Sequence, residues 1–91
     1  MSSTHLIVRH TVDDYAAWRS VYDSVEDLRR GFGCTRAAVL TDPGDKNDVY
    51  VVHEFPSLEQ ARDYAASDDL RAAMRKAGVS GPPRIEIAVE A

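Results

Sequence analysis

The stretch "VYVVHEFPSLEQARDYA", residues 49–65, changes its hydrophobic period halfway along. β-Branched and aromatic residues dominate residues 49–55, which is typical of a strand. Ser57 and Gln60 then form an S-x-x-Q capping box, and apolar residues recur at helical spacing after it. The stretch therefore predicts a strand that leads directly into a helix.

The N-terminal part of the chain has the same order. Residues 4–12, "THLIVRHTV", form a short β-branched run that predicts a strand. Asp13 is the expected N-cap of the following helix, and Gly31 and Gly33 are expected to end it. The apolar face of this single amphipathic helix comprises Tyr15, Trp18, Val21, Tyr22, Val25 and Leu28.

Three further segments complete the pattern. Residues 34–41 predict a strand, and the polar "DPGDKND" at residues 42–48 predicts a hairpin loop to the next strand. Residues 70–78 predict a second helical segment, and residues 78–83 predict a loop because their prolines cannot continue a helix. Residues 84–91 alternate strictly, as a last strand does.

The resulting order, βαββαβ, is typical of the ferredoxin-like class of α+β folds. We expect one domain over residues 1–91, with a four-stranded antiparallel-type sheet in the order 4-1-3-2 and the helices on one face. Within this sheet we expect the strands at residues 4–12 and 49–55 to be adjacent and parallel.

Composition narrows the class of protein. The net charge is −4 and the basic residues do not cluster beyond Arg29 and Arg30, which argues against nucleic-acid binding. The apolar runs are too short to span a membrane, and the N-terminus lacks the features of a signal peptide. The single cysteine, Cys34, fits a reducing cytoplasm and is expected to be a small core or edge residue.

The predicted strands have one apolar face and one mixed face. The apolar face, which we assign to the helices, comprises Leu6, Val8, His10, Val12, Val49, Val51, His53, Phe55, Ile85, Ile87 and Val89. The opposite face combines Ile7, Tyr50 and Val52 with Arg9, Glu54 and Glu86. Exposed apolar area of this kind favours a homodimer through this face, and the alternative is a solvated sheet face.

Two histidines lie on the helix-facing side. If the strands at residues 4–12 and 49–55 are parallel, His10 and His53 lie level, and a strand spacing of ~4.8 Å brings their imidazoles into contact. Trp18, Tyr22 and Tyr64 would lie over them. A neutral imidazole in such a site takes a proton from a phenol or an activated C–H, and aromatic side chains stack on planar ligands.

Other interpretations of these residues stay open. Two histidines could begin a metal site, but this face offers no third ligand, so we expect no metal. Alternatively, His10 and His53 are packed histidines that bond to each other or to tyrosine hydroxyls, and Trp18 and Tyr22 are ordinary core residues.

The segments "VDDYAAWRSVYD" (residues 12–23) and "VYVVHEFPSLEQARDYAASDDLRAAM" (residues 49–74), with the βαββαβ order, resemble the antibiotic biosynthesis monooxygenase-like, or dimeric α/β-barrel, superfamily. The resemblance implies a homodimer whose two sheets face each other as a barrel. It also implies a pocket between helices and sheet in each subunit, on the side of His10 and His53. The superfamily includes cofactor-independent monooxygenases of polyketide aromatics, haem-degrading enzymes, polyketide cyclases and isomerases.

The sequence departs from two of these groups. Haem-degrading members have a strand asparagine, a tryptophan and a helix histidine, whereas here the only asparagine is Asn47 and Phe55 stands at the tryptophan position. We therefore expect no cofactor. Plant polyketide cyclases resemble the chain at "HLIV" (residues 5–8) and Tyr64, but Leu70 stands near their catalytic histidine. That resemblance would place His5 in the pocket, whereas strand alternation places it on the opposite face.

We hypothesise a small homodimer that binds an aromatic or polyketide-like molecule and acts as a cofactor-independent monooxygenase or a cyclase. His10 or His53 would be the base and Tyr64 would orient the substrate. The pocket walls would be Trp18, Tyr22 and Phe55. The alternative is a non-catalytic ligand-binding or structural homodimer.

Overall fold

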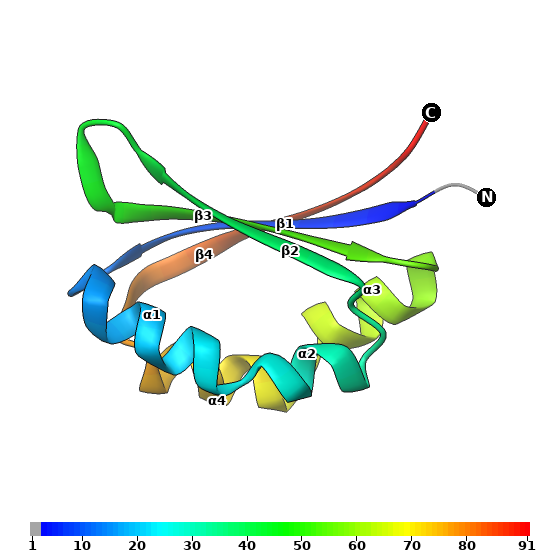
Figure 1. Ribbon diagram of the computed structural model, residues 1–91, viewed down its shortest axis with the longest axis horizontal. Helices are drawn as coiled ribbons and strands as arrows, with labels where there is room; N and C mark the ends of the chain where they lie inside the picture. The colour runs from blue at the N-terminus through cyan, green and yellow to red at the C-terminus, as the bar shows by residue number, and fades with distance from the viewer. Residues whose placement is uncertain (1–2) are drawn as a thin grey trace.

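A computed structural model describes residues 3–91 of the chain. In chain order its elements are β1 (Thr4–Val12), α1 (Tyr15–Ser24), α2 (Glu26–Gly31), β2 (Arg36–Asp42), β3 (Asp45–Phe55), α3 (Leu58–Ala65), α4 (Asp68–Lys76) and β4 (Val79–Val89). The four strands form one sheet in the order β2-β3-β1-β4, and all the helices cover the same face of it (Figure 1). The predicted fold class and strand order are confirmed.

The predicted direction of two strands is wrong. β1 and β3 are antiparallel, with His10 opposite Val49 and Leu6 opposite His53. The connections explain this direction. The crossover through α1 and α2 makes β1 and β2 parallel, and the β2–β3 hairpin makes β3 antiparallel to β2. Because β3 lies between β1 and β2, it must run opposite to both.

The two faces of the sheet are distributed as the alternation predicts. Every helix-facing residue of β1 and of residues 49–55 in β3 is buried, and Leu6 and Val49 are fully so. On β4, Ile87 is partly buried, but Ile85 and Val89 are exposed. β4 is an edge strand, so the helices cover less of its inner side.

The capping residues fix where the helices begin. Ser57 accepts a hydrogen bond from the Gln60 N–H, as the capping box predicts, and α3 begins at the next residue. The N-cap of α1 is Asp14, whose side chain accepts from the Ala16 N–H, and the predicted N-cap, Asp13, is wrong. The backbone N–H of Asp13 instead donates to the Gly78 carbonyl, which ties the end of β1 to the start of β4.

The single helix predicted after β1 is two helices. Val25 interrupts it with φ −106° and ψ 21°, and α2 continues from Glu26. Side chains donate hydrogen bonds to backbone carbonyls at the end of α1. The Ser24 hydroxyl donates to the Val21 carbonyl, and the Arg29 guanidinium donates to the Tyr22 carbonyl. Such competition for helix carbonyls is a known cause of helix breaks.

The loop predicted at residues 78–83 is part of β4, which begins at Val79. The pairing of β4 with β1 shifts between Arg9 and Thr11, so residues 81–83 bulge opposite His10. Prolines are tolerated there because an edge strand at a bulge needs no N–H from them. Gly81 supplies the positive φ of 73°.

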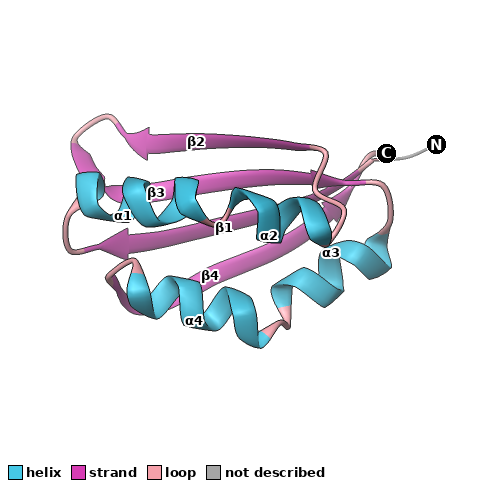
Figure 2. Ribbon diagram, turned by 60° about the horizontal axis from the view of Figure 1, so that its bottom comes forward, coloured by secondary structure: helices cyan, strands magenta, loops and turns pink. Residues whose placement is uncertain are grey.

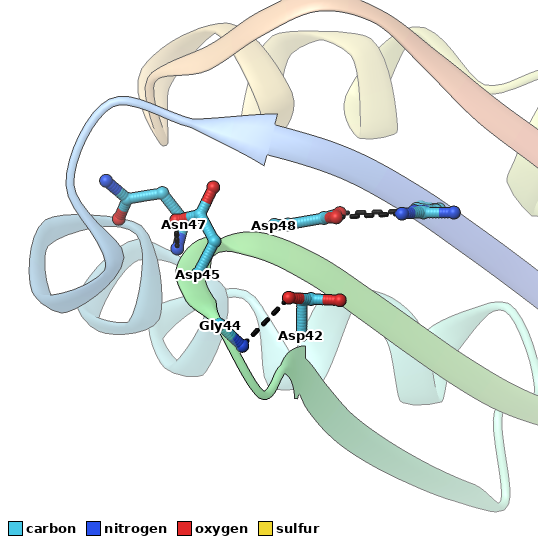
Figure 3. A network of polar contacts seen from close by, with 6 residues as sticks. Asp42, Gly44, Asp45, Asn47 and Asp48 are labelled. Carbon is cyan, nitrogen blue, oxygen red and sulfur yellow. Dashed lines mark hydrogen bonds and ion pairs between the residues drawn. The ribbon is translucent and has the colours of Figure 1, made fainter.

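The turn between β2 and β3 is shorter than the predicted loop at residues 42–48. Two side chains hold it: the Asp42 carboxylate accepts from the Gly44 N–H, and the Asp45 carboxylate accepts from the Asn47 N–H (Figure 3). Each bond is 2.9 Å long. Aspartate side chains commonly accept a hydrogen bond from the backbone N–H two residues further along the chain. These bonds make the turn compact, so β2 extends to Asp42 and β3 begins at Asp45.

No helix covers the other face of the sheet within residues 3–91 (Figure 1). On this face Arg9 forms an ion pair with Asp48 at 2.8 Å and lies over the Tyr50 ring. None of the helices in the described residues is long and apolar enough to cross a membrane.

Candidate functional site

A row of aromatic side chains from α1 lies between the helices and the sheet. Trp18 and Tyr22, one turn apart, stack with centroids 4.9 Å apart and planes 17° apart. Trp18 meets the edge of His10 at 5.6 Å, and Tyr22 stacks near His53 at 6.1 Å. The Trp18–Tyr22 stack therefore lies between His10 and His53 and contacts both.

The predicted contact between the two histidines is wrong. Because β1 and β3 are antiparallel, His53 lies level with Leu6 rather than with His10. Four residues along a strand separate these levels, which is about 13 Å. The structure brings each histidine to one end of the Trp18–Tyr22 stack.

His53 has the more elaborate surroundings of the two. It is only 3% exposed, and its Nε2 lies 3.2 Å from the Tyr22 hydroxyl, in hydrogen-bond contact. Tyr64 of α3 meets it edge-on at 5.7 Å, and Phe55 packs at 6.5 Å. Its Nδ1 is buried and has no hydrogen-bond partner among residues 3–91. One ring nitrogen is thus oriented by Tyr22 while the other has no partner.

His10 is 6% exposed and packs against Trp18. Within the described residues neither of its ring nitrogens has a hydrogen-bond partner. Buried polar atoms usually have a hydrogen-bond partner, so these three ring nitrogens are unusual among the side chains of residues 3–91. The expectation that the two histidines bond to each other is wrong, and only His53 bonds to a tyrosine hydroxyl.

Burial favours the neutral forms of these groups. Burial and, to a lesser degree, the Arg29 cation lower the pKa of His53 to about 4, and burial lowers the pKa of His10. Burial likewise raises the pKa of Tyr22 and raises that of Tyr64 to about 12. At neutral pH the site therefore holds neutral imidazoles and neutral phenols.

A cavity of about 40 Å³ lies among these side chains. Five of the six predicted site residues line it, namely His10, Trp18, Tyr22, His53 and Tyr64, and Phe55 alone lies outside the lining formed by the described residues. The remaining lining residues are Val8, Val21, Val25, Arg29, Val51, Leu70, Ala73, Met74 and Ala77.

The sixth, Phe55, is buried behind His53 and Tyr64, at 6.5 and 5.8 Å between ring centroids. The cavity thus lies between the helices and the sheet, on the predicted side of the sheet.

Sequence reasoning missed Arg29, which lines the same cavity. Its guanidinium lies 3.7 Å over the Tyr22 ring and donates to the Tyr22 carbonyl at 2.7 Å. The sequence presents Arg29 beside Arg30 in a polar stretch, which is typical of an exposed helix face. No local pattern distinguishes Arg29, which is buried, from Arg30, which is exposed.

The other candidates have simpler positions. His5 lies on the open face of the sheet, opposite Glu54, so strand alternation placed it correctly. Cys34 is partly buried and lies two residues before β2, and its thiol contacts the Arg36 carbonyl at 3.3 Å. Among residues 3–91 no three His, Cys, Asp or Glu side chains gather as a metal site would need.

Solved structures of other proteins resemble this fold. The sequence matches no family model and no curated protein. A predicted antibiotic biosynthesis monooxygenase from Bordetella bronchiseptica has a similar structure, with a TM-score of 0.84, 13% identity, and coverage of 100% of this chain and 99% of that one. The chain shares the fold of antibiotic biosynthesis monooxygenase-like proteins.

Two further solved structures agree with this fold. SnoaB, a cofactor-independent oxygenase from Streptomyces nogalater, gives a TM-score of 0.73 at 14% identity, over 100% of this chain and 93% of that one. A protein of unknown function from Nitrosomonas europaea gives 0.78 at 22% identity, over 99% and 90%. The predicted resemblance is therefore confirmed at the level of the fold.

Proposed function

We propose that this protein binds a planar aromatic or polyketide-like molecule between its helices and its sheet, and that His53 removes a proton from it. The observation that carries the proposal is the buried imidazole of His53, which Tyr22 holds at Nε2 while Nδ1 has no partner among the described residues. A neutral imidazole with a free nitrogen is suited to accept a proton.

The lining residues support an aromatic ligand. The rings of Trp18, Tyr22 and Tyr64 line the cavity beside His53 and give it an aromatic wall. Leu70 and Met74 of α4 close the opposite side of the cavity. A flat apolar ring with one acidic hydroxyl or C–H would match this combination of surfaces.

The cavity must widen to admit such a ring. It measures about 40 Å³, whereas one water needs about 10–15 Å³ and an engineered cavity that binds benzene measures about 150 Å³. Residues from α1, α2 and α4 line it, and these helices lie side by side on the sheet (Figure 2). We expect α4 to separate from α1 and α2, with the break at Val25 absorbing part of the movement.

The chemistry proposed for the site is proton transfer. The ligand's O–H or C–H bond breaks, its electron pair stays on the ligand, and His53 carries the proton as an imidazolium. Cofactor-independent oxygenation and cyclisation both need such an activated ligand, and SnoaB is an oxygenase of the first kind. We propose one of these two reactions, in the reducing cytoplasm that a single cysteine suits.

Histidine ring NMR with a panel of planar phenols tests this function. Binding should move the ring signals of His53, and the His53→Gln variant should bind the same phenols without turning them over. His5→Gln is the matched control because His5 lies on the open sheet face. If no phenol moves the His53 signals, the proposed function is wrong.

A specific observation favours a second function, a structural homodimer. The cavity is small, and the open sheet face carries Ile7, Tyr50 and Val52, which are only partly buried. We propose that a second copy covers this face, because its apolar residues are flanked by both Arg9 and Glu54, so that two copies complement each other. Dimerisation is compatible with ligand binding, and the NMR panel decides whether the protein does more than dimerise.

A further inference from the structure

Arg29 is a buried cation that the proposed proton transfer does not use. It is only 5% exposed and lines the cavity beside His53, Tyr22 and Tyr64. A buried charge is costly unless an opposite charge or several hydrogen bonds compensate for it. The neighbours of Arg29 therefore need to be accounted for.

No carboxylate lies within 4.0 Å of the Arg29 side chain among residues 3–91. The two acidic residues on its outer side are already paired. Asp23 binds Arg19 at 3.1 Å, and Glu26 binds Arg30 at 3.2 Å. The exposed Arg19 and Arg30 thus each have a carboxylate partner, whereas the buried Arg29 has none among residues 3–91.

The partial compensation that Arg29 does have comes from α1. Its guanidinium donates to the Tyr22 carbonyl at 2.7 Å and lies over the Tyr22 ring at 3.7 Å. The C-terminal end of a helix favours a cation, and a guanidinium has five N–H donors. These contacts fix the orientation of Arg29 but bring no negative charge to it.

We propose that Arg29 binds the anionic group of the ligand, so that the ligand is an aromatic oxyanion, either an aryl carboxylate or an ionised phenol. The inference rests on the proposed function, because the aromatic part occupies the same cavity. Tyr22 and Tyr64 line the same cavity, and their neutral hydroxyls are further hydrogen-bond donors available to the oxyanion.

Calorimetry with two naphthalene probes tests the charge preference. 2-Naphthoate and 2-naphthamide have nearly the same shape, but only the first is an anion. A hydrogen bond to a charged group contributes enough to make naphthoate bind about tenfold tighter or more. Arg29→Gln should remove this preference, Arg29→Lys should keep it, and Arg30→Gln, which alters the exposed neighbour, should leave it unchanged.

The source of the oxyanion is tested with 2-naphthol. If the site selects an ionised phenol, bound 2-naphthol shows the red-shifted absorbance of its naphtholate, whether the proton goes to His53 or to the buffer. If bound 2-naphthol keeps the absorbance of the neutral phenol and naphthoate binds tighter, the carboxylate is the preferred oxyanion.

The outcomes separate the two proposals. Equal affinities for naphthoate and naphthamide in the wild-type protein overturn the role of Arg29 and leave aromatic binding intact. If neither probe binds, both proposals fail. If Arg29→Gln does not fold, the wild-type comparison and Arg29→Lys still decide the question.

Discussion

His53 combines burial with an oriented ring, and each property has a separate cause. Burial beneath α1 and α3 keeps the imidazole neutral, while the Tyr22 hydroxyl at 3.2 Å fixes which nitrogen is occupied. The imidazole is therefore unprotonated and held in one orientation before a ligand arrives. At the scale of the residue, the same burial makes the folded protein sensitive to acid.

The stability of the folded state should fall as the pH decreases from 6.5 towards 4. The pKa of His53 is about 4 in the folded state and 6.5 for an ordinary histidine in the unfolded chain, so the unfolded state binds more protons in this window. The resulting loss is about 3 kcal/mol at most. Urea unfolding at several pH values measures it, and His53→Gln should remove this part of the pH dependence.

His5→Gln is the control for the loss of a histidine as such, because His5 lies on the open sheet face. An unchanged pH dependence in His53→Gln would show that His53 is not the buried neutral group described above.

Sequence reasoning located the histidines but not their relationship. Strand alternation was sufficient to place His10 and His53 under the helices, because it depends only on neighbouring residues. The predicted contact between them is wrong because it assumes parallel strands, whereas the hairpin after β2 requires β3 to run antiparallel to β1. Arg29 was missed for a different reason: its burial depends on tertiary packing that no local pattern reports.

At the scale of the elements, the connection from α2 to β2 depends on two glycines with different roles. Gly33 has φ 100°, and a Cβ at this position would collide with the Gln60 side chain. Gly31 lies within α2, and a Cβ there would meet nothing within 4 Å. Strands and capped helices were predictable from local patterns, whereas the break at Val25 and the proline-containing β4 depend on contacts made only after folding.

We expect Gly33→Ala to lower the free energy of unfolding by about 1–2 kcal/mol, because an alanine is strained at positive φ. Gly31→Ala should raise it by up to about 1 kcal/mol, because alanine is the better helix former. Thermal and urea unfolding of the two variants measure both effects. Equal effects of the same sign would contradict the distinct roles of the two glycines.

At the scale of the whole molecule, the two faces of the sheet differ in what covers them. The helix side encloses the cavity, and the other side is free of helices within the described residues (Figure 1). A chain of 91 residues buries a modest fraction of its surface, so a second copy on the open face would add stability.

We expect sedimentation to give twice the 10.1 kDa mass of the chain. Val52→Lys places a charge at the centre of the open face and should shift the protein to the monomer. Ala72→Lys, on the exposed side of α4, is the matched control and should remain a dimer. A wild-type protein that sediments as a monomer at all concentrations would contradict the dimer.

Intermolecular NOEs between a bound planar aromatic, such as 2-naphthoate, and the protein test the central claim most directly. The ring protons of the ligand should give NOEs to Trp18 and to the carbon-bound ring protons of His53, because both residues line the cavity. NOEs confined to Ile7, Tyr50 or other residues of the open sheet face, or none at all, would contradict a ligand site between the helices and the sheet.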